Sequence, residues 1–256
     1  MLENFFRPRS VAVIGASRDP EKLGFAVLDN LQKGGYEGDL YPINPKAEEI
    51  LGLEAYASVL DVPDPVEMAV IVVPAKIVPH VLRECGEKGT SAVVIITAGF
   101  REAGREGLEQ EKELIDIAEE YDLRLIGPNC LGVIDTETPL NATFAAGMPP
   151  GGPIAFMSQS GALGTAVLDL AMAGRIGFSK FASLGNKADV SETDLLKAWG
   201  DDPDSRVILI YVEGLPDGQA FMDVAREVTR QKPVVAIKSG VTKSGSRAVS
   251  SHTGSL

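Results

Sequence analysis

One of the two histidines in the sequence stands among small residues, where its imidazole would be open to a reacting group. His252 follows a loop of small and basic residues at 241–248. An imidazole can attack phosphorus when a carboxylate holds one ring nitrogen and the other nitrogen stays unprotonated. Glu213, after an apolar run, is the favoured carboxylate, and Asp189 and Glu192 are less favoured substitutes. Because a lone histidine is more often a surface residue, a role as phosphoryl carrier depends on what surrounds it.

A predicted helix start provides a place for an anion. The apolar run 154–157 leads into Ser158, Ser160, Gly161 and Ala162, after which an apolar helical pattern begins. With Ser160 as N-cap, the free N–H groups of the first turn would point outward beside two hydroxyls. These four residues are predicted to bind phosphate. A plainly capped helix explains the same pattern equally well.

A glycine loop near the N-terminus predicts a second phosphate site. Gly15, Ala16 and Ser17 follow the apolar run 11–14, and Gly24 opens the next amphipathic stretch. Backbone N–H groups at such a turn can face a pyrophosphate. The match to the dinucleotide fingerprint G-x-G-x-x-G is imperfect, because Ser17 stands where the second glycine would be.

The end of the second predicted strand discriminates between cofactors. Nicotinamide sites usually have Asp or Glu here to bind the ribose hydroxyls, whereas this sequence has Asn44 and Lys46. A cation suits a phosphorylated ribose, as in NADP or the 3′-phosphate of coenzyme A. A solvated loop lysine is the equally weighted alternative.

Further turns at predicted strand ends point to one cleft, because open parallel sheets bind ligands at the carboxyl ends of their strands. The turns predicted to contribute cofactor-binding residues contain Val73, Pro74, Ala98, Gly99 and Asn129. Gly and Pro also turn a chain without any ligand, so the pattern favours a cleft without identifying its occupant.

Short β-branched runs alternate with amphipathic stretches, a pattern typical of βα units in parallel sheets. The predicted strands are 11–14, 40–43, 68–73, 92–97, 123–126, 154–157, 178–183, 207–211 and 234–237. The predicted helices are 24–33, 77–88, 108–121, 162–173, 192–199 and 219–229. Three prolines and two glycines at 148–153 predict a linker. We therefore expect an α/β protein with a Rossmann-like domain at 1–147 and a second parallel-sheet domain at 148–256.

Composition excludes several classes of protein. A net charge of −12 over 256 residues argues against a nucleic-acid partner. No apolar run is long enough to span a membrane, and no secretory signal is recognisable. Two cysteines without CxxC spacing predict neither a disulfide framework nor a metal site. A reducing cytoplasm is the expected location.

Five motifs between residues 127 and 256, in the family's order, resemble the ADP-forming acyl-CoA (acetyl-CoA) synthetases and, more distantly, the α subunit of succinyl-CoA synthetase. The similarity spans essentially the whole chain. The motifs are Gly127-Pro-Asn-Cys130, Ser158-Gln-Ser-Gly-Ala-Leu163, Leu184-Gly-Asn-Lys-Ala-Asp189, Tyr211-Val-Glu-Gly214 and Ser251-His-Thr-Gly-Ser-Leu256. The resemblance implies a coenzyme A (CoA) domain followed by a flavodoxin-like domain with a phosphorylated histidine. His252 matches that histidine, Glu213 the glutamate that orients it, and the segment 158–162 the helix start that holds phosphate. Segments containing Gly15, Ser17, Lys46 and Val73 resemble CoA-contacting loops, and Asn129 matches the motif beside the thiol end.

The implied reaction interconverts acyl-CoA, ADP and phosphate with acid, CoA and ATP through an acyl phosphate and then a phosphohistidine. Positioning and charge stabilisation dominate phosphoryl transfer, which suits these residues. No G-x-x-x-x-G-K-[ST] loop occurs in the sequence. In the family, an ATP-grasp domain or subunit binds the Mg-ADP or Mg-ATP, and without it this chain is expected to be inactive. An oligomeric assembly is also expected.

The family's α part continues past the histidine motif, whereas this sequence stops at Leu256. We therefore expect a piece of a longer protein in which 240–256 is disordered or displaced. Two alternatives remain at this point. An NAD(P)-binding oxidoreductase domain would share the glycine loop but leaves His252 unexplained. A non-catalytic CoA-binding regulatory module would be expected to lack that histidine.

Overall fold

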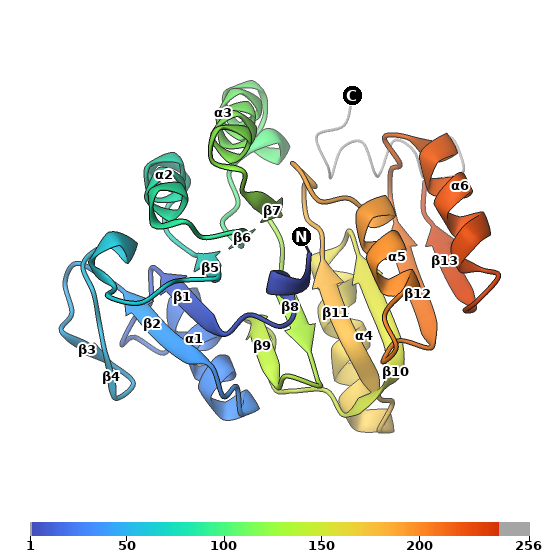
Figure 1. Ribbon diagram of the computed structural model, residues 1–256, viewed down its shortest axis with the longest axis horizontal. Helices are drawn as coiled ribbons and strands as arrows, with labels where there is room; N and C mark the ends of the chain where they lie inside the picture. The colour runs from blue at the N-terminus through green and yellow to red at the C-terminus, as the bar shows by residue number, and fades with distance from the viewer. Residues whose placement is uncertain (1, 241–256) are drawn as a thin grey trace.

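The computed structural model describes residues 2–240 and consists of two α/β halves. Each half has a central sheet with helices on both faces (Figure 1). The predicted α/β architecture is therefore confirmed. The segment predicted to be disordered, apart from its first residue, and His252 itself lie outside the described residues.

The first sheet is parallel throughout, and its strands alternate between two cores. Its strands, in spatial order, are β2 (Asp39–Ile43), β1 (Ser10–Ile14), β5 (Met68–Ile71), β6 (Ala92–Ile95) and β7 (Arg124–Ile126). The helices are α1 (Leu23–Gly34), α2 (Val78–Lys88) and α3 (Arg105–Tyr121). Val11 and Val13 of β1 share a core with α1, whereas Ala12 and Ile14 share a core with α2 and α3. Both faces of each strand are thus buried, which explains the continuous apolar runs.

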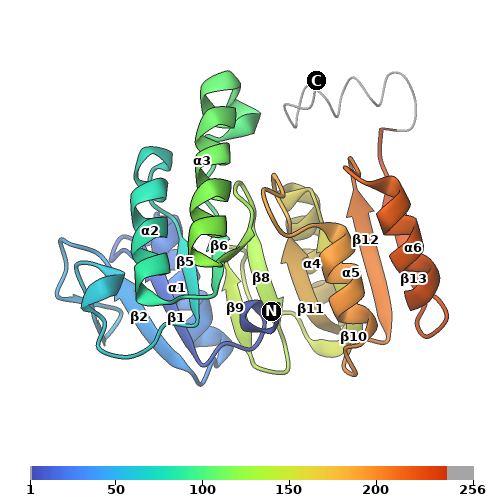
Figure 2. The ribbon, with the colours of Figure 1, turned by 45° about the horizontal axis from the view of Figure 1, so that its top comes forward.

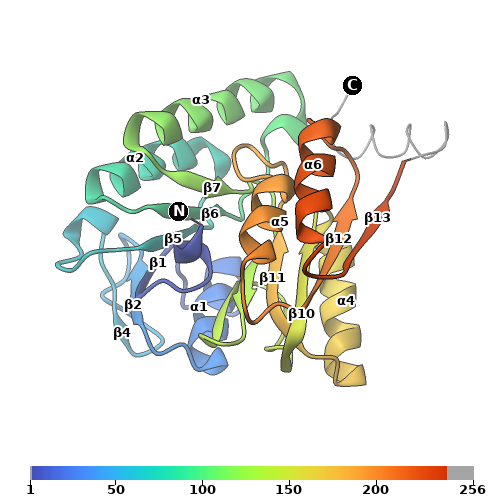
Figure 3. The same cartoon turned by 45° about the vertical axis from the view of Figure 1, so that its right-hand side comes forward.

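The second sheet is mixed. Its strands, in spatial order, are β13 (Val234–Lys238), β12 (Val207–Val212), β10 (Gly151–Ser158), β11 (Phe178–Ser183), β8 (Gly132–Asp135) and β9 (Leu140–Thr143). The first four are parallel, and β8 is antiparallel to both its neighbours. The helix α4 (Gly161–Gly174) covers one face, and α5 (Glu192–Gly200) and α6 (Gly218–Val228) cover the other (Figure 3).

The hairpin of β8 and β9 joins the two halves (Figure 2). It pairs with the second sheet, but Asn30 of α1 donates hydrogen bonds to the carbonyls of Thr143 and Ala145 at 2.8 and 2.7 Å. The chain therefore passes from the first sheet to the second between β7 and β8. The domain boundary predicted between 147 and 148 remains a prediction, since this hairpin contacts both halves.

Every predicted strand and helix is present, with ends displaced by at most three residues. The sequence patterns missed four short strands, which are β8, β9, β3 (Glu49–Ile50) and β4 (Leu53–Glu54). Short 3₁₀ turns also occur at Glu3–Phe5, Val59–Asp61, Ala75–Ile77 and Arg101–Ala103. Among the helices described, none is long and apolar enough to cross a bilayer.

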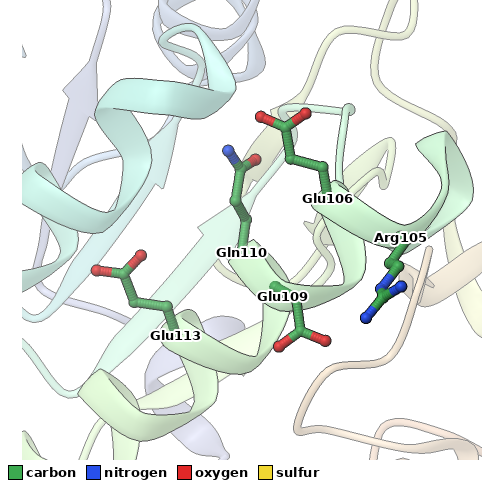
Figure 4. Close-up of a pocket in the computed structure, with 5 residues that line it drawn as sticks. All are labelled: Arg105, Glu106, Glu109, Gln110 and Glu113. Carbon is green, nitrogen blue, oxygen red and sulfur yellow. The ribbon is translucent and has the colours of Figure 1, made fainter.

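A shallow depression on α3 is an ordinary solvated helix face. Its lining side chains all come from one helix and project away from the ribbon (Figure 4), and they are Arg105, Glu106, Glu109, Gln110 and Glu113. Two of the carboxylates already have partners, because Glu109 pairs with Lys112 at 3.0 Å and Glu113 pairs with Arg83 at 2.8 Å. Within residues 2–240, the residues that line this depression all belong to α3, and the contact with Arg83 of α2 is an ordinary ion pair.

Candidate functional site

A cavity of about 810 Å³ lies between the two halves and collects predicted residues from both. The first half contributes Ala98 and Asn129, which follow β6 and β7. The second half contributes the start of α4 and the end of β12, with lining residues Ser160, Gly161, Ala162 and Glu213. Residues far apart in the sequence therefore meet because both sheets present the carboxyl ends of parallel strands to one space.

The start of α4 is built as the sequence predicts. Ser160 is the N-cap, and its Oγ accepts a hydrogen bond from the N–H of Leu163 at 3.3 Å. The N–H groups of Gly161 and Ala162 have no hydrogen-bond partner within residues 2–240. Two orphan donors and the positive end of a helix dipole thus face the cavity. This is an arrangement suited to phosphate.

Ser158 stabilises the turn that precedes α4. Its side chain is fully buried, and its Oγ donates to the carbonyl of Ser160 at 2.8 Å and accepts from the N–H of Ser160 at 3.1 Å. Ser158 is not among the residues that line the cavity. Its hydroxyl holds the turn from which α4 begins, and a direct phosphate contact remains a prediction.

Glu213 directly follows β12, and its carboxylate has no hydrogen bond or ion pair within residues 2–240. Both substitutes considered from the sequence are engaged elsewhere. Asp189 pairs with Arg124 at 2.9 Å, and Glu192 is buried against Lys187 at 3.0 Å. Of the three carboxylates, Glu213 is the one with its oxygens available to a nearby imidazole.

The glycine loop after β1 has the tight geometry that a phosphate loop requires. Gly15 has φ +97°, and a Cβ there would lie 3.0–3.1 Å from atoms of Val72 and Val73. A Cβ on Gly24 would lie 1.9 Å from the carbonyl oxygen of Gly15, so the first turn of α1 packs directly against the backbone of the loop. Both positions require glycine for close backbone approach.

Asn44 ties the loop after β2 to this glycine loop. Its Nδ2 donates to the carbonyl of Ala16 at 2.7 Å, and its Oδ1 accepts from the N–H of Lys46 at 2.9 Å. Lys46 itself is exposed. The Oγ of Ser17 accepts from the N–H of Asp19 at 3.0 Å and so closes a local turn.

The cofactor residues predicted from the sequence lie along one sheet edge, but most of them do not line the cavity. Those outside it are Gly15, Ala16, Ser17, Asn44, Lys46, Val73, Pro74 and Gly99. The strand order places their loops side by side, from β2 through β1 and β5 to β6 and β7. At about 4.8 Å between strands, the edge from the loop of β2 to the loop of β7 measures roughly 19 Å. An elongated ligand lying along it would reach the cavity with one end.

The sequence reasoning missed a group of polar side chains in the cavity wall. Gln159, Lys187, Arg101, Asn186 and Lys238 all line it. Three of them, Gln159, Asn186 and Lys187, lie inside the family motifs without having been predicted as site residues. Their neighbours in the sequence are small or polar, so no periodic signal separates them from ordinary loop residues.

Arg101 and Asn186 join the halves across the cavity floor. The guanidinium of Arg101 donates to the carbonyl of Asn186, and Nδ2 of Asn186 donates to Glu102 at 2.6 Å and to Glu111 at 2.7 Å. Burial alone would raise the pKa of Glu102, but hydrogen bonds from Asn186 and from the N–H of Gly99 outweigh it and hold the pKa below its ordinary value. The loop of β6 is thereby fixed against the second half.

Comparisons with known proteins identify the two halves. The family model described as a CoA binding domain matches residues 9–136, and the model described as a succinyl-CoA ligase like flavodoxin domain matches residues 151–256. The chain is 51% identical over 257 residues to the α subunit of acetate–CoA ligase (ADP-forming) II of Pyrococcus furiosus, with 100% of this chain and 56% of that protein covered. It is 45% identical over 253 residues to 4-hydroxybutyrate–CoA ligase (ADP-forming) of Nitrosopumilus maritimus, with 97% of this chain and 36% of that protein covered.

A solved structure is also similar to this chain over its full length. The dinucleotide-forming acetyl-coenzyme A synthetase 1 of Candidatus Korarchaeum cryptofilum, in complex with phosphate and ADP, superposes with a TM-score of 0.96 at 46% identity. The match covers 100% of this chain and 55% of that one. This chain thus spans a little over half the length of the Pyrococcus and Korarchaeum proteins. With both family models and the motif order in agreement, the chain belongs to the ADP-forming acyl-CoA synthetase family.

Proposed function

We propose that this chain is the part of an ADP-forming acyl-CoA synthetase that binds CoA and carries the phosphoryl group on His252. The observation that carries the proposal is the cavity itself. It joins the end of the CoA domain, at Asn129, to the open helix terminus at Gly161 and Ala162 and to the carboxylate of Glu213. Thioester, phosphate and imidazole would all have to meet in such a space.

In this proposal CoA lies along the edge of the first sheet. The cation of Lys46 faces the 3′-phosphate, and the glycine loop at Gly15 receives the pyrophosphate. The pantetheine arm then crosses the loops of β5 and β6, and the thiol end reaches Asn129 at the cavity. The strand order and the roughly 19 Å edge support this placement. The cationic end of β2 favours it over a nicotinamide cofactor.

The chemistry then runs in two transfers. An oxygen of phosphate attacks the thioester carbonyl, so that a C–O bond forms, the C–S bond breaks and CoA leaves as its thiolate. The imidazole of His252 next attacks the phosphorus of the acyl phosphate, so that an N–P bond forms and the carboxylate of the acid leaves. The amides of Gly161 and Ala162 offset the negative charge on the phosphoryl oxygens, and Glu213 holds the second ring nitrogen.

A Mg-ADP site is proposed to lie outside this chain, on an ATP-grasp domain or subunit that accepts the phosphoryl group from His252. Within residues 2–240 no group of three His, Cys, Asp or Glu residues is placed to hold a metal ion. We further propose that the assembled enzyme is an oligomer and is located in the cytoplasm.

The test uses the intact enzyme, meaning the full-length protein with its nucleotide-binding part. With acetyl-CoA and labelled phosphate, we expect an acid-labile label on this chain that ADP discharges as labelled ATP. H252A should abolish the label and retain CoA binding by calorimetry. H80A is the matched control, because His80 lies exposed on α2 beside Glu84.

Either of two results would refute the proposal. One is a label that persists in H252A, and the other is an active wild-type enzyme that acquires no label. A chain that binds CoA but takes no label under any acyl-CoA would instead be a regulatory module. Tight NADH binding without CoA binding would indicate an oxidoreductase.

A further inference from the structure

Gln159 makes three hydrogen bonds to the backbone of the turn that contains Glu213. The Oε1 of Gln159 accepts hydrogen bonds from the N–H of Glu213 at 2.7 Å and from the N–H of Gly214 at 3.0 Å. The Nε2 of the same amide donates to the carbonyl of Gly214 at 2.8 Å. The amide therefore pairs with both ends of this short backbone segment, as a neighbouring strand would.

A buried ion pair supports the same turn. The Nζ of Lys187 donates to the carbonyl of Gly214 at 2.8 Å and pairs with Glu192 at 3.0 Å. The Glu192 side chain is 1% exposed and the Lys187 side chain 8% exposed. Gln159 completes the cluster by donating to Glu192 at 3.2 Å. Three backbone atoms of Glu213 and Gly214 and the two charges are thus satisfied together. A pair buried this deeply keeps its geometry because separation leaves an uncompensated charge.

The charge on Lys187 depends on this arrangement. Burial lowers the pKa of its ammonium below the ordinary value, and the carboxylate of Glu192 opposes that shift. Glu213 also favours the charged form. The ammonium is thus paired with the buried carboxylate of Glu192, while the charge of Glu213, which lines the cavity, also favours its protonated form.

The Glu213 side chain makes no hydrogen bond or ion pair within residues 2–240, so its position follows from its backbone. Gln159, which bonds to that backbone together with Lys187 and Lys238, is the residue immediately before the N-cap of α4 at Ser160. The same short segment therefore carries the open helix terminus and sets where the carboxylate stands relative to it.

We propose that Gln159 and Lys187 are positioning residues, which hold the Glu213–Gly214 turn at a fixed place relative to the start of α4. The inference depends on the proposed function, because it assigns these residues an effect on phosphoryl transfer through Glu213. A misplacement of the order of 1 Å can cost about 100-fold in rate. The bonds in this cluster are what keep the turn from shifting by that amount.

A double-mutant cycle in the intact enzyme tests the proposal. Q159L and K187M are each made alone and together with E213Q, and kcat, the KM for CoA and the Kd for CoA are measured. We expect each single variant to lower kcat by about 10- to 100-fold with the CoA constants within about twofold. In the E213Q background neither should lower kcat further, because groups that act through one another are not additive. If the variants acted only by loosening the packing, they would still lower kcat in the E213Q background.

The controls separate the possible failures. K112M removes a lysine that also pairs at 3.0 Å, with Glu109, but on the exposed face of α3, and it should leave kcat unchanged. Q159L leaves no buried charge unpaired, so it still decides the question if K187M does not fold. If the losses multiply with that of E213Q, the residues act independently and the proposal is wrong while the proposed function stands. If wild type takes no label on His252, both are wrong.

Discussion

Arg124 at the start of β7 forms a two-point ion pair with Asp189, which comes before α5 in the other half of the molecule. Nε and Nη2 of the guanidinium lie 2.9 and 3.0 Å from the two carboxylate oxygens, and the same carboxylate accepts the N–H of Leu125 at 2.7 Å. Paired Arg and carboxylate forks fix orientation as well as distance. The pair therefore sets how the CoA domain and the flavodoxin-like domain face each other.

Removal of this pair should weaken the contact between the domains. We expect R124M to lower the free energy of unfolding by about 1–2 kcal/mol, because a charge-assisted bidentate pair is lost at a partly buried site. Denaturant unfolding measures the difference. R226M is the control, since Arg226 pairs with Asp223 at 2.7 Å on the exposed surface of α6, and it should cost less than about 0.5 kcal/mol. Equal losses in the two variants would argue against a role in joining the domains.

The glycine loop allows the effect of backbone conformation to be separated from that of close approach. Gly15 and Gly52 both have positive φ, but a Cβ on Gly52 would meet nothing within 4 Å. We expect G15A to cost about 1–3 kcal/mol of stability and to weaken CoA binding, whereas G52A should cost about 1 kcal/mol and leave CoA binding intact. Calorimetric titration with CoA and denaturant unfolding of both variants provide the comparison. Unchanged CoA affinity in G15A would exclude the loop from the binding site.

Lys46 should recognise one phosphate of the cofactor. K46M is expected to weaken the binding of CoA by about 5- to 30-fold, because one ionic contact with the 3′-phosphate is removed. The affinity for dephospho-CoA, which lacks the 3′-phosphate, should stay nearly unchanged. The CoA affinity of wild type should fall with added salt more steeply than that of K46M. K33M is the control, because Lys33 is a similarly exposed lysine on α1 that pairs with Asp29. An equal loss for both ligands would exclude a contact between Lys46 and the 3′-phosphate.

Asp202 should make stability depend on pH. Burial would raise the pKa of its carboxyl, but hydrogen bonds from Ser205 and Lys180 outweigh burial and hold the pKa below its ordinary value of 3.8. A depressed pKa stabilises the fold above the unfolded value, and this contribution is lost as the pH falls through the folded pKa. We expect D202N to cost about 1–3 kcal/mol at pH 7, with the difference from wild type shrinking below about pH 4. Urea unfolding between pH 2.5 and 7 measures it, with the exposed D223N as control. A difference that stays constant down to pH 2.5 would contradict this assignment.

The fold was predictable where burial imposes a strict pattern. Strands such as β1 are buried on both faces, so their residues form a continuous apolar run bounded by turns. The hairpin of β8 and β9 was missed because it is short and interrupted by polar residues such as Asp135 and Asn141. Both side chains are buried. Their partners come together only in the folded chain, where Asp135 pairs with Lys180 at 3.1 Å and Thr143 donates to Asn141 at 2.7 Å.

The site was predictable to the extent that backbone geometry dictates residue type. Gly15 and Ser160 stand out because a left-handed turn and a helix cap each require particular residues. Gln159 and Lys187 do not stand out, because their roles arise from partners 54 and 27 residues away. A glutamine or lysine in a loop is usually solvated, and only the tertiary structure distinguishes these two.

The β8–β9 hairpin connects the two domains, because it pairs with the second sheet and accepts hydrogen bonds from Asn30 of the first half. Together with the contacts of Arg124 and Arg101, it attaches the CoA domain at three separate places. An opening and closing motion of the domains would have to break all three at once. We therefore expect the two cavity walls to keep fixed positions relative to each other. The flexible arm of the ligand, and not either domain, would then move along the cavity.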